Sequence, residues 1–203
     1  VTDVKKEVKS ISAPKLFDLT SLQREANKKF GYTAQQTLDY MQSLYEKKLV
    51  TYPRTDSQYL SDDMEQTAYA LIPAISEHFG FGSVAEPNLR AVINNRKVTG
   101  HHAIIPTESG VKCDISALAA GEKNILKLVA LRLLCASASA YRYGAAKVTL
   151  SCENTDFTAS GKTVLESGWK ALDGIIGEAE KSDVKSLPDL ERGLTFTAKA
   201  TKS

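Results

Sequence analysis

The spacing of apolar residues changes twice along this chain, and this change constrains the fold more than any other feature. Residues 1–12 alternate valine or isoleucine with lysine and serine, which is the two-residue period of a half-buried strand. Strand patterns return in residues 145–152, 155–160 and 162–166, and residues 194–200 alternate again. The long segment between these ends has helical spacing. The order predicts an α+β fold, in which a mainly helical, winged-helix-like domain is inserted into a small antiparallel β domain.

Capping signals divide the helical segment. Residues 20–23 and 33–36 both have the spacing of a capping box, a Thr followed three residues later by Gln. Gly31, between them, is typical of a helix end. Two capped helices joined by a tight glycine turn predict a helix-turn-helix. Further helices are predicted after Ser61 and over residues 122–139.

These patterns give the domain boundaries. We place the helical domain at residues 19–142 and a discontinuous β domain at residues 1–18 and 143–203. The composition, 42% hydrophobic and 25% charged over 203 residues, is that of a globular protein. The net charge of +2 does not by itself indicate a nucleic-acid binder, so any DNA contact must depend on local placement of charge.

Three cysteines, odd in number and without C-x-x-C spacing, indicate a reduced intracellular protein and neither a disulfide framework nor a zinc site. We therefore expect a cytoplasmic protein. Since no apolar run approaches the roughly 20 residues that a membrane span needs, we expect no membrane partner.

The segment Thr51-Tyr52-Pro53-Arg54-Thr55-Asp56-Ser57 is the first candidate for chemistry. A phenol, with a pKa near ~10, is a poor nucleophile at neutral pH. A guanidinium two residues away favours the phenolate and holds a phosphate oxygen, which is what attack on a phosphodiester requires. In a purely structural interpretation, Tyr52 packs on an edge strand and Arg54 pairs with Asp56.

The second candidate is Gly100-His101-His102-Ala103-Ile104-Ile105-Pro106-Thr107, where one histidine of the pair could give a phosphate a hydrogen bond or a positive charge. A zinc site needs further ligands, and only His78 and Cys113 lie near in sequence, so we predict no metal site. In a purely structural interpretation, His101 and His102 are solvated or cap a nearby element.

Both motifs resemble those of a known family. Residues 13–59, APKLFDLTSLQREANKKFGYTAQQTLDYMQSLYEKKLVTYPRTDSQY, closely resemble the region around the active tyrosine of type IA DNA topoisomerases, above all the topoisomerase III branch. Residues 100–107 resemble that family's second active-site motif, H-[HE]-A-I-x-P-T, and Leu187-Pro188-x-Leu190-x-x-Gly193 resembles part of its β domain. The resemblance covers nearly the whole chain.

The resemblance implies a role for each matching residue. Tyr52 would attack one DNA strand and stay bound to the 5′ phosphate, with Arg54 holding the scissile phosphate. His101 matches the phosphate-contacting histidine, while His102 stands where relatives have His or Glu. Glu46 matches an acidic position near the active site, although a solvated carboxylate at a helix end looks the same.

A wider DNA-binding set follows from the residues around these positions. His102, Thr55 and Ser57 belong to it, although Thr55 and Ser57 also fit a role in shaping the loop. A basic group on the two capped helices could follow a DNA backbone, although solvated helix faces look the same; it comprises Arg24, Lys28, Lys29, Lys47 and Lys48.

The family's Mg²⁺-binding acidic cluster belongs to a separate N-terminal domain. Asp62-Asp63-x-Glu65 falls at a helix start, where carboxylates favour the dipole, and Asp189-x-Glu191 lies in a loop. The resemblance therefore implies part of an enzyme that cleaves and rejoins single-stranded DNA and changes DNA topology. Its Mg²⁺ would be bound by the missing N-terminal domain and not by this chain. The alternatives are a non-catalytic helix-turn-helix DNA-binding module and an interaction domain.

Overall fold

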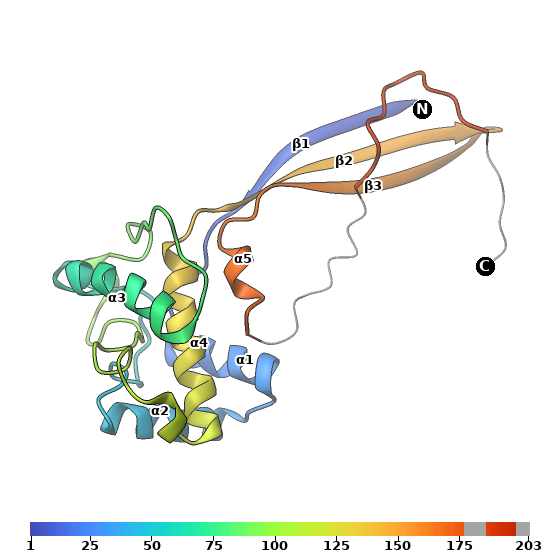
Figure 1. Ribbon diagram of the computed structural model, residues 1–203. Coiled ribbons are helices and arrows are strands. Elements are labelled where there is room, and N and C mark those ends of the chain that lie inside the picture. Colours follow the sequence, from blue (N-terminus) through green and yellow to red (C-terminus); the bar gives the residue numbers. More distant parts are fainter. Residues whose placement is uncertain (177–185, 198–203) are drawn as a thin grey trace. The chain divides into compact units, whose positions relative to one another are not determined.

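The computed structural model describes residues 1–176 and 186–197, which form two compact units (Figure 1). The described residues of the β unit are 1–11, 141–167 and 186–197, and those of the helical unit are 12–140 and 168–176. The α+β class is confirmed. Residues 12–18 and 168–176 belong to the helical unit and not, as expected above, to the β domain, because Leu16, Phe17 and Leu172 are buried among its helices.

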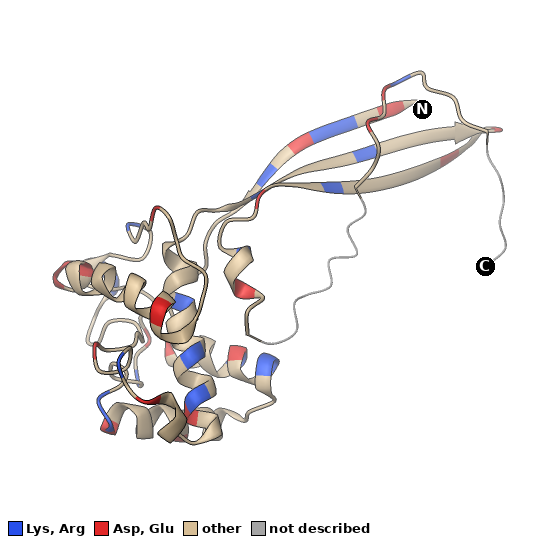
Figure 2. Cartoon of the chain, in the orientation of Figure 1, with Lys and Arg blue, Asp and Glu red and all other residues tan. Residues whose placement is uncertain are grey.

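The β unit is a three-stranded antiparallel sheet in the order β1-β2-β3, with β1 Asp3–Ile11, β2 Tyr141–Cys152 and β3 Thr155–Glu166. Glu153 and Asn154, both at positive φ, form the two-residue turn between β2 and β3. Figure 2 shows both signs of charge along β1, where lysines pair with neighbouring acids of the same strand.

Two expectations for this unit were wrong. Residues 155–160 and 162–166 are one strand, because Gly161 continues it: a Cβ there would lie 2.5 Å from Leu187 Cγ, so the glycine admits a close approach and marks no turn. Residues 194–197 form no strand; only Gly193 and Leu194 bond to Val1. The remainder of that predicted strand, 198–200, lies outside the described residues.

The helical unit contains α1 Leu19–Phe30, α2 Ala34–Glu46, α3 Glu65–Phe79, α4 Ala120–Ser137 and the short α5 Lys170–Asp173. Three 3₁₀ turns accompany them, η1 Asp62–Met64, η2 Asn95–Lys97 and η3 Ile115–Ala117.

The caps of the first two helices were predicted in part. The box at Thr33 and Gln36 is confirmed, and Gly31 ends α1 at φ 70°. The N-cap of α1 is Asp18 and not Thr20: its carboxylate accepts from Ser21 N at 2.6 Å. A carboxylate at this position outcompetes a hydroxyl two residues later, because it meets the first free N–H groups of the helix.

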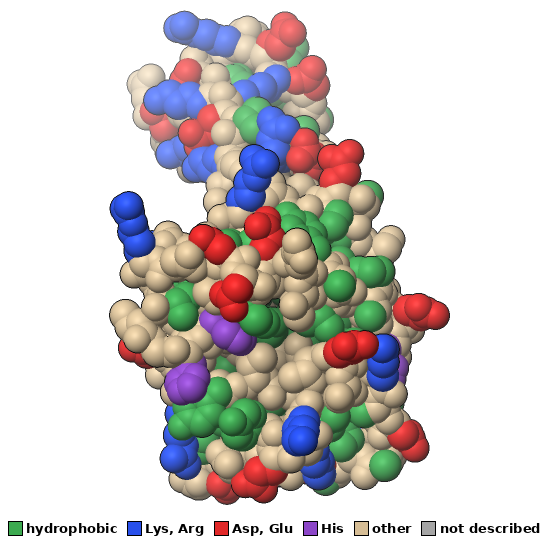
Figure 3. All heavy atoms as spheres, turned by 90° about the vertical axis from the view of Figure 1, so that its left-hand side faces the viewer, with side chains coloured by type: hydrophobic (Ala, Val, Ile, Leu, Met, Phe, Trp, Pro, Cys, Tyr) green, Lys and Arg blue, Asp and Glu red, His purple; other side chains and the backbone are tan. Residues whose placement is uncertain are grey.

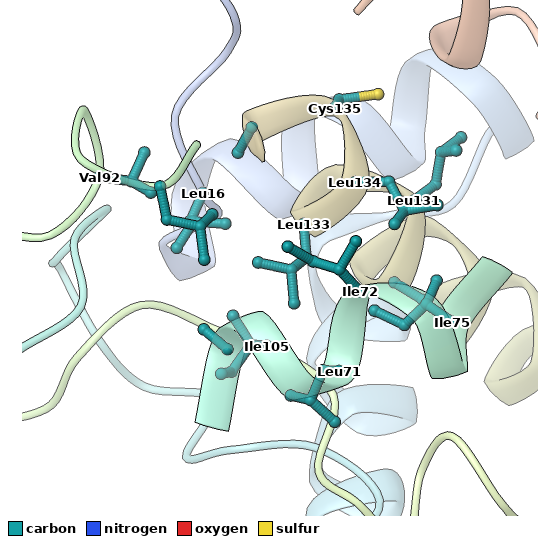
Figure 4. Close-up of a cluster of buried hydrophobic side chains, with 14 of the residues drawn as sticks. Leu16, Leu71, Ile72, Ile75, Val92, Ile105, Leu131, Leu133, Leu134 and Cys135 are labelled. Carbon is teal, nitrogen blue, oxygen red and sulfur yellow. The ribbon is translucent and has the colours of Figure 1, made fainter. Parts of the chain in front are cut away.

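Helix α4 is buried on nearly every side and joins two apolar clusters. Its C-terminal half packs with α3 in the first cluster, where Leu131, Leu133 and Leu134 meet Ile72 and Ile75 (Figure 4). Its N-terminal half packs with α1 and α2 in the second cluster. This all-round apolar helix supports the loops that carry the candidate site.

Candidate active site

Two loops of the helical unit are joined by hydrogen bonds. We call residues 49–59 the tyrosine loop and residues 100–107 the histidine loop. Thr51 N donates to Ile105 O at 3.0 Å, and Thr51 Oγ1 accepts from Ile105 N at 3.0 Å. The same hydroxyl is 3.2 Å from Ala103 O, to which it donates. The two sequence motifs therefore form one site.

Buried side chains fix the histidine loop in the core. Ala103 and Ile105 pack in the first apolar cluster and Ile104 in the second, which is the alternation of an extended segment. Ile104 N also donates to Phe17 O at 2.8 Å. Burial of each isoleucine contributes about 1.5–3 kcal/mol, enough to hold the preceding histidine pair at a defined place.

Tyr52 and His101 lie against one another. Their ring centroids are 4.2 Å apart with an interplanar angle of 37°. Tyr45, from α2, packs edge-on against Tyr52 at 5.5 Å. Within the described ranges no protein group hydrogen-bonds to Tyr52 Oη, so the hydroxyl is available to a ligand. Figure 3 shows histidine side chains at the surface beside a group of hydrophobic ones. Both rings can reach one phosphate group.

Arg54 is exposed and follows the buried Pro53. In the part of the chain that the structure describes, its guanidinium forms no ion pair, so the alternative pairing with Asp56 is absent. A guanidinium without a carboxylate partner, two residues from the phenol, remains able to bind a phosphate.

Thr55 and Ser57 are 6% and 5% exposed, and their hydroxyls bond to the protein. Thr55 Oγ1 donates to His101 O at 2.8 Å, and Ser57 Oγ donates to Lys97 O at 2.8 Å. These bonds shape the tyrosine loop and join it to its neighbours, which fits the loop-shaping role; contact of either residue with DNA stays a prediction.

His102 differs from His101. Its Nδ1 lies 2.8 Å from Ala103 O, and since a carbonyl only accepts, Nδ1 carries the proton and donates. The ring is half-buried, whereas His101 is exposed. The structure therefore gives His102 a loop contact and leaves the imidazole of His101 against Tyr52.

Glu46 is the last residue of α2 and is exposed. Gln42 Nε2 donates to its Oε1 at 3.0 Å. Glu46 is adjacent in sequence to Tyr45, whose ring contacts Tyr52, so it lies near the site; its carboxylate makes no direct contact with Tyr52 or Arg54 among the described residues.

Two of the predicted DNA-contacting lysines are engaged within the protein. Lys29 is 11% exposed; its Nζ donates to Ile176 O at 2.8 Å and faces Glu25 at 3.6 Å and Asp173 at 3.9 Å. These contacts give Lys29 a structural role in the helical unit, and its predicted contact with DNA stays a prediction.

Lys47 bonds to both carboxylate oxygens of Glu122, at 2.7 and 2.8 Å. Ser43 and Ala119 N–H also donate to that carboxylate. Burial alone would raise the pKa of Glu122, but the hydrogen bonds from Lys47, Ser43 and the Ala119 amide outweigh it and lower the pKa. Lys47 therefore links α2 to α4, and its predicted contact with DNA stays a prediction. Arg24, Lys28 and Lys48 are exposed.

Sequence reasoning missed two lysines near the site. Lys15 and Lys97 both lie over the ring of Tyr59, a residue of the tyrosine loop. They are 82 positions apart in sequence, so no local pattern connects them.

Within the described residues no group of three or more His, Cys, Asp or Glu side chains could hold a metal ion. Asp62, Asp63 and Glu65 lie at the starts of η1 and α3, and Asp189 pairs with Lys6. A search of the same residues finds no helix of the length and apolarity that a membrane span requires.

Known proteins match this chain throughout its length. The model of a DNA topoisomerase family matches residues 1–203. DNA topoisomerase 3 of Bacillus licheniformis is 39% identical over 209 residues, covering 98% of this chain and 28% of the relative. DNA topoisomerase 3 of Bacillus subtilis is 38% identical with the same coverage. The chain thus spans 28% of the length of these curated relatives.

A solved structure has the same fold. Full-length topoisomerase I from Thermotoga maritima matches with a TM-score of 0.64 and 24% identity, covering 91% of this chain and 31% of that one. The whole-chain family match and the identity to the Bacillus proteins carry the assignment. The chain belongs to the DNA topoisomerase family, and the resemblance to its type IA, topoisomerase III-like members is confirmed.

Proposed function

We propose that Tyr52 is the nucleophile that cleaves and rejoins one DNA strand in a type IA topoisomerase. The observation that carries this proposal is the contact of the Tyr52 and His101 rings, whose centroids are 4.2 Å apart; Arg54, two residues after Tyr52, forms no ion pair within the described ranges. These are the three groups that the two family motifs contribute. The names of the relatives support a topoisomerase and give no support to a non-catalytic DNA-binding module.

The reaction exchanges one phosphodiester for another. Tyr52 Oη forms a bond to phosphorus as the bond to the 3′ oxygen breaks; the phenol loses its proton and the 3′ oxygen gains one. Arg54 and His101 stabilise the negative charge that the phosphoryl oxygens gain. The strand then has a free 3′ hydroxyl and a 5′ phosphotyrosine, and rejoining reverses each step.

The remainder of a topoisomerase would supply what the described residues do not hold. They do not fit a Mg²⁺ site, so we propose that a separate acidic domain binds Mg²⁺. The proposed substrate is single-stranded DNA. The three free cysteines support the proposal of a cytoplasmic protein.

A trapping experiment tests the nucleophile. The full-length protein is mixed with a single-stranded oligonucleotide labelled at its 3′ end and then denatured. Since the tyrosine holds the 5′ phosphate of the downstream piece, the label should become protein-bound. Tyr52→Phe should abolish the adduct. Tyr45→Phe is the matched control, because that ring contacts Tyr52, and it should retain the adduct. An adduct in the Tyr52→Phe protein would overturn the proposal.

A further inference from the structure

Lys15, Tyr59 and Lys97 form a basic cluster to which the resemblance described above assigns no role. The Lys15 and Lys97 ammonium nitrogens lie 5.0 and 4.6 Å from the centre of the Tyr59 ring. Lys97 Nζ also donates to Tyr59 Oη at 3.1 Å. The aromatic ring therefore gathers two like charges at one place, an arrangement that cation–π attraction favours only weakly at an exposed site.

The positive charge of this cluster is not neutralised within the described ranges. Neither Lys15 nor Lys97 forms an ion pair there, whereas Lys5, Lys9, Lys47 and Lys112 each face a carboxylate. Hydrogen bonds from Lys15 and then Lys97 lower the pKa of the Tyr59 phenol, which reflects the same local excess of positive charge. Two ammonium groups held together without an acid attract an anion.

The cluster is attached to both loops of the candidate active site. Tyr59 O accepts from Ala103 N at 2.8 Å, and Ala103 is two residues from His101. Ser57 Oγ donates to Lys97 O. Tyr59 follows Tyr52 by seven residues, and these bonds attach the cluster to the loops that carry Tyr52 and His101.

Lys15 belongs both to the cluster and to a pocket. Lys15 also lines a cavity of about 460 Å³ together with Arg24, Arg132, Ser21 and Gln58. Arg132 is held over the Phe17 ring at 4.1 Å and faces Glu25 at 3.7 Å, so it is already engaged, while Arg24 is exposed. Glu25 lines the cavity too, so its lining carries three basic side chains and one acidic one.

We propose that Lys15 and Lys97 bind a phosphate of the DNA strand other than the one that Tyr52 attacks, and that the Tyr59 ring positions both lysines. The inference rests on the proposed function, since it takes the ligand to be the DNA strand that enters the site. Compact ammonium groups suit a phosphate contact that carries no sequence information. Its effect would be to fix the register of the strand at Tyr52.

The test compares two double variants of the full-length protein, both made with Tyr52→Phe so that binding is measured without cleavage. Lys15→Gln/Lys97→Gln removes the cluster. Lys5→Gln/Lys112→Gln is the control. It removes the same number of positive charges from exposed lysines that already face Asp3 and Glu108. Binding of a fluorescent single-stranded oligonucleotide is followed by anisotropy from low to physiological salt, and thermal melting checks that each variant folds.

The cluster variant should bind about tenfold more weakly at low salt, and the slope of log K against log salt should fall by about 0.7, the value for one phosphate contact on a single strand. The control variant should change neither the affinity at low salt nor the salt slope by a comparable amount. Oligonucleotides with one neutral methylphosphonate then locate the contact. A methylphosphonate at one position away from the cleavage site should weaken binding of the Tyr52→Phe protein. The same substitution should have no further effect on binding of the cluster variant.

An unchanged slope in a folded cluster variant, or equal slopes in the cluster and control variants, would overturn the proposal. So would a methylphosphonate effect that persists at every position in the cluster variant. Failure of Tyr52 to form an adduct would contradict the proposed function alone, because the binding comparison requires no cleavage.

Discussion

The side chains proposed for strand cleavage are held in place in different ways. Tyr52 is held between two rings, those of His101 and Tyr45. Arg54 extends into solvent after a buried proline. The phenol is thus positioned by packing, whereas the guanidinium is left to be ordered by its ligand.

Arg54→Lys should reduce the cleavage rate by more than tenfold while leaving the melting temperature unchanged. Lysine keeps the charge but not the planar fork that grips two phosphate oxygens. Since the residue is exposed and unpaired in the described structure, no loss of stability is expected. The rate is measured in single turnover with an end-labelled oligonucleotide. A rate within about threefold of wild type would show that charge alone is sufficient.

His101→Ala should slow cleavage more than His102→Ala. The His101 ring contacts Tyr52, and loss of a group that stabilises the transition state costs about 10²–10³ in rate. His102 instead donates to Ala103 O, so its loss acts through the loop. Single-turnover rates of both variants give the comparison, and equal rates would contradict this order.

Sequence reasoning found the tyrosine and histidine motifs but could not sort the basic residues. Helical spacing does not reveal whether a lysine is solvated or paired. The partners of Lys29 and Lys47, Asp173 and Glu122, lie 144 and 75 positions away. The cluster of Lys15, Tyr59 and Lys97 was missed for the same reason, because its two lysines lie 82 positions apart.

At the level of helices and strands, local signals predicted existence and type better than boundaries. Capping and periodicity predicted helices that begin near Thr20 and Thr33 and one over 122–139, and the structure has them at 19–30, 34–46 and 120–137. Gly161 was misinterpreted as a turn, because a glycine that admits a neighbouring segment looks the same in sequence as one that reverses the chain. The short α5 was missed, since its docking is tertiary.

Glu122→Gln should destabilise the helical unit by about 1–2 kcal/mol at pH 7, because the amide keeps the hydrogen-bond acceptor for Ser43 but loses the charge that faces the half-exposed Lys47. The folded-state pKa of Glu122 is lowered, so its contribution is present above the unfolded value near ~4.3 and is lost as the pH falls through the folded pKa. Denaturant melts of both proteins should therefore differ at pH 6–8 and converge in acid. A difference that grows on acidification would contradict this account.

For the whole molecule, the decisive fact is that the chain spans 28% of the length of its curated relatives. Each described unit has its own sheet or apolar clusters, so the 203 residues should fold. We propose that passage of a DNA strand requires further parts of a topoisomerase besides these units.

The 203-residue chain by itself should bind single-stranded DNA weakly and should not relax supercoiled plasmid in the presence of Mg²⁺. It keeps the candidate site and the basic residues, but the resemblance places the Mg²⁺-binding acids in another domain. Gel electrophoresis of plasmid incubated with the purified chain shows the outcome. A ladder of relaxed topoisomers that Tyr52→Phe abolishes would refute this prediction and leave the tyrosine assignment intact.

The most direct test of the central claim is the chemical identity of the residue that carries the DNA. The adduct of the full-length protein is trapped on a single-stranded oligonucleotide and digested with nuclease and protease, and its peptides are sequenced by mass spectrometry. The account predicts a nucleotide joined through its 5′ phosphate to Tyr52, with Tyr45 and Tyr59 unmodified. A nucleotide on any other residue, or one joined through its 3′ phosphate, would contradict it.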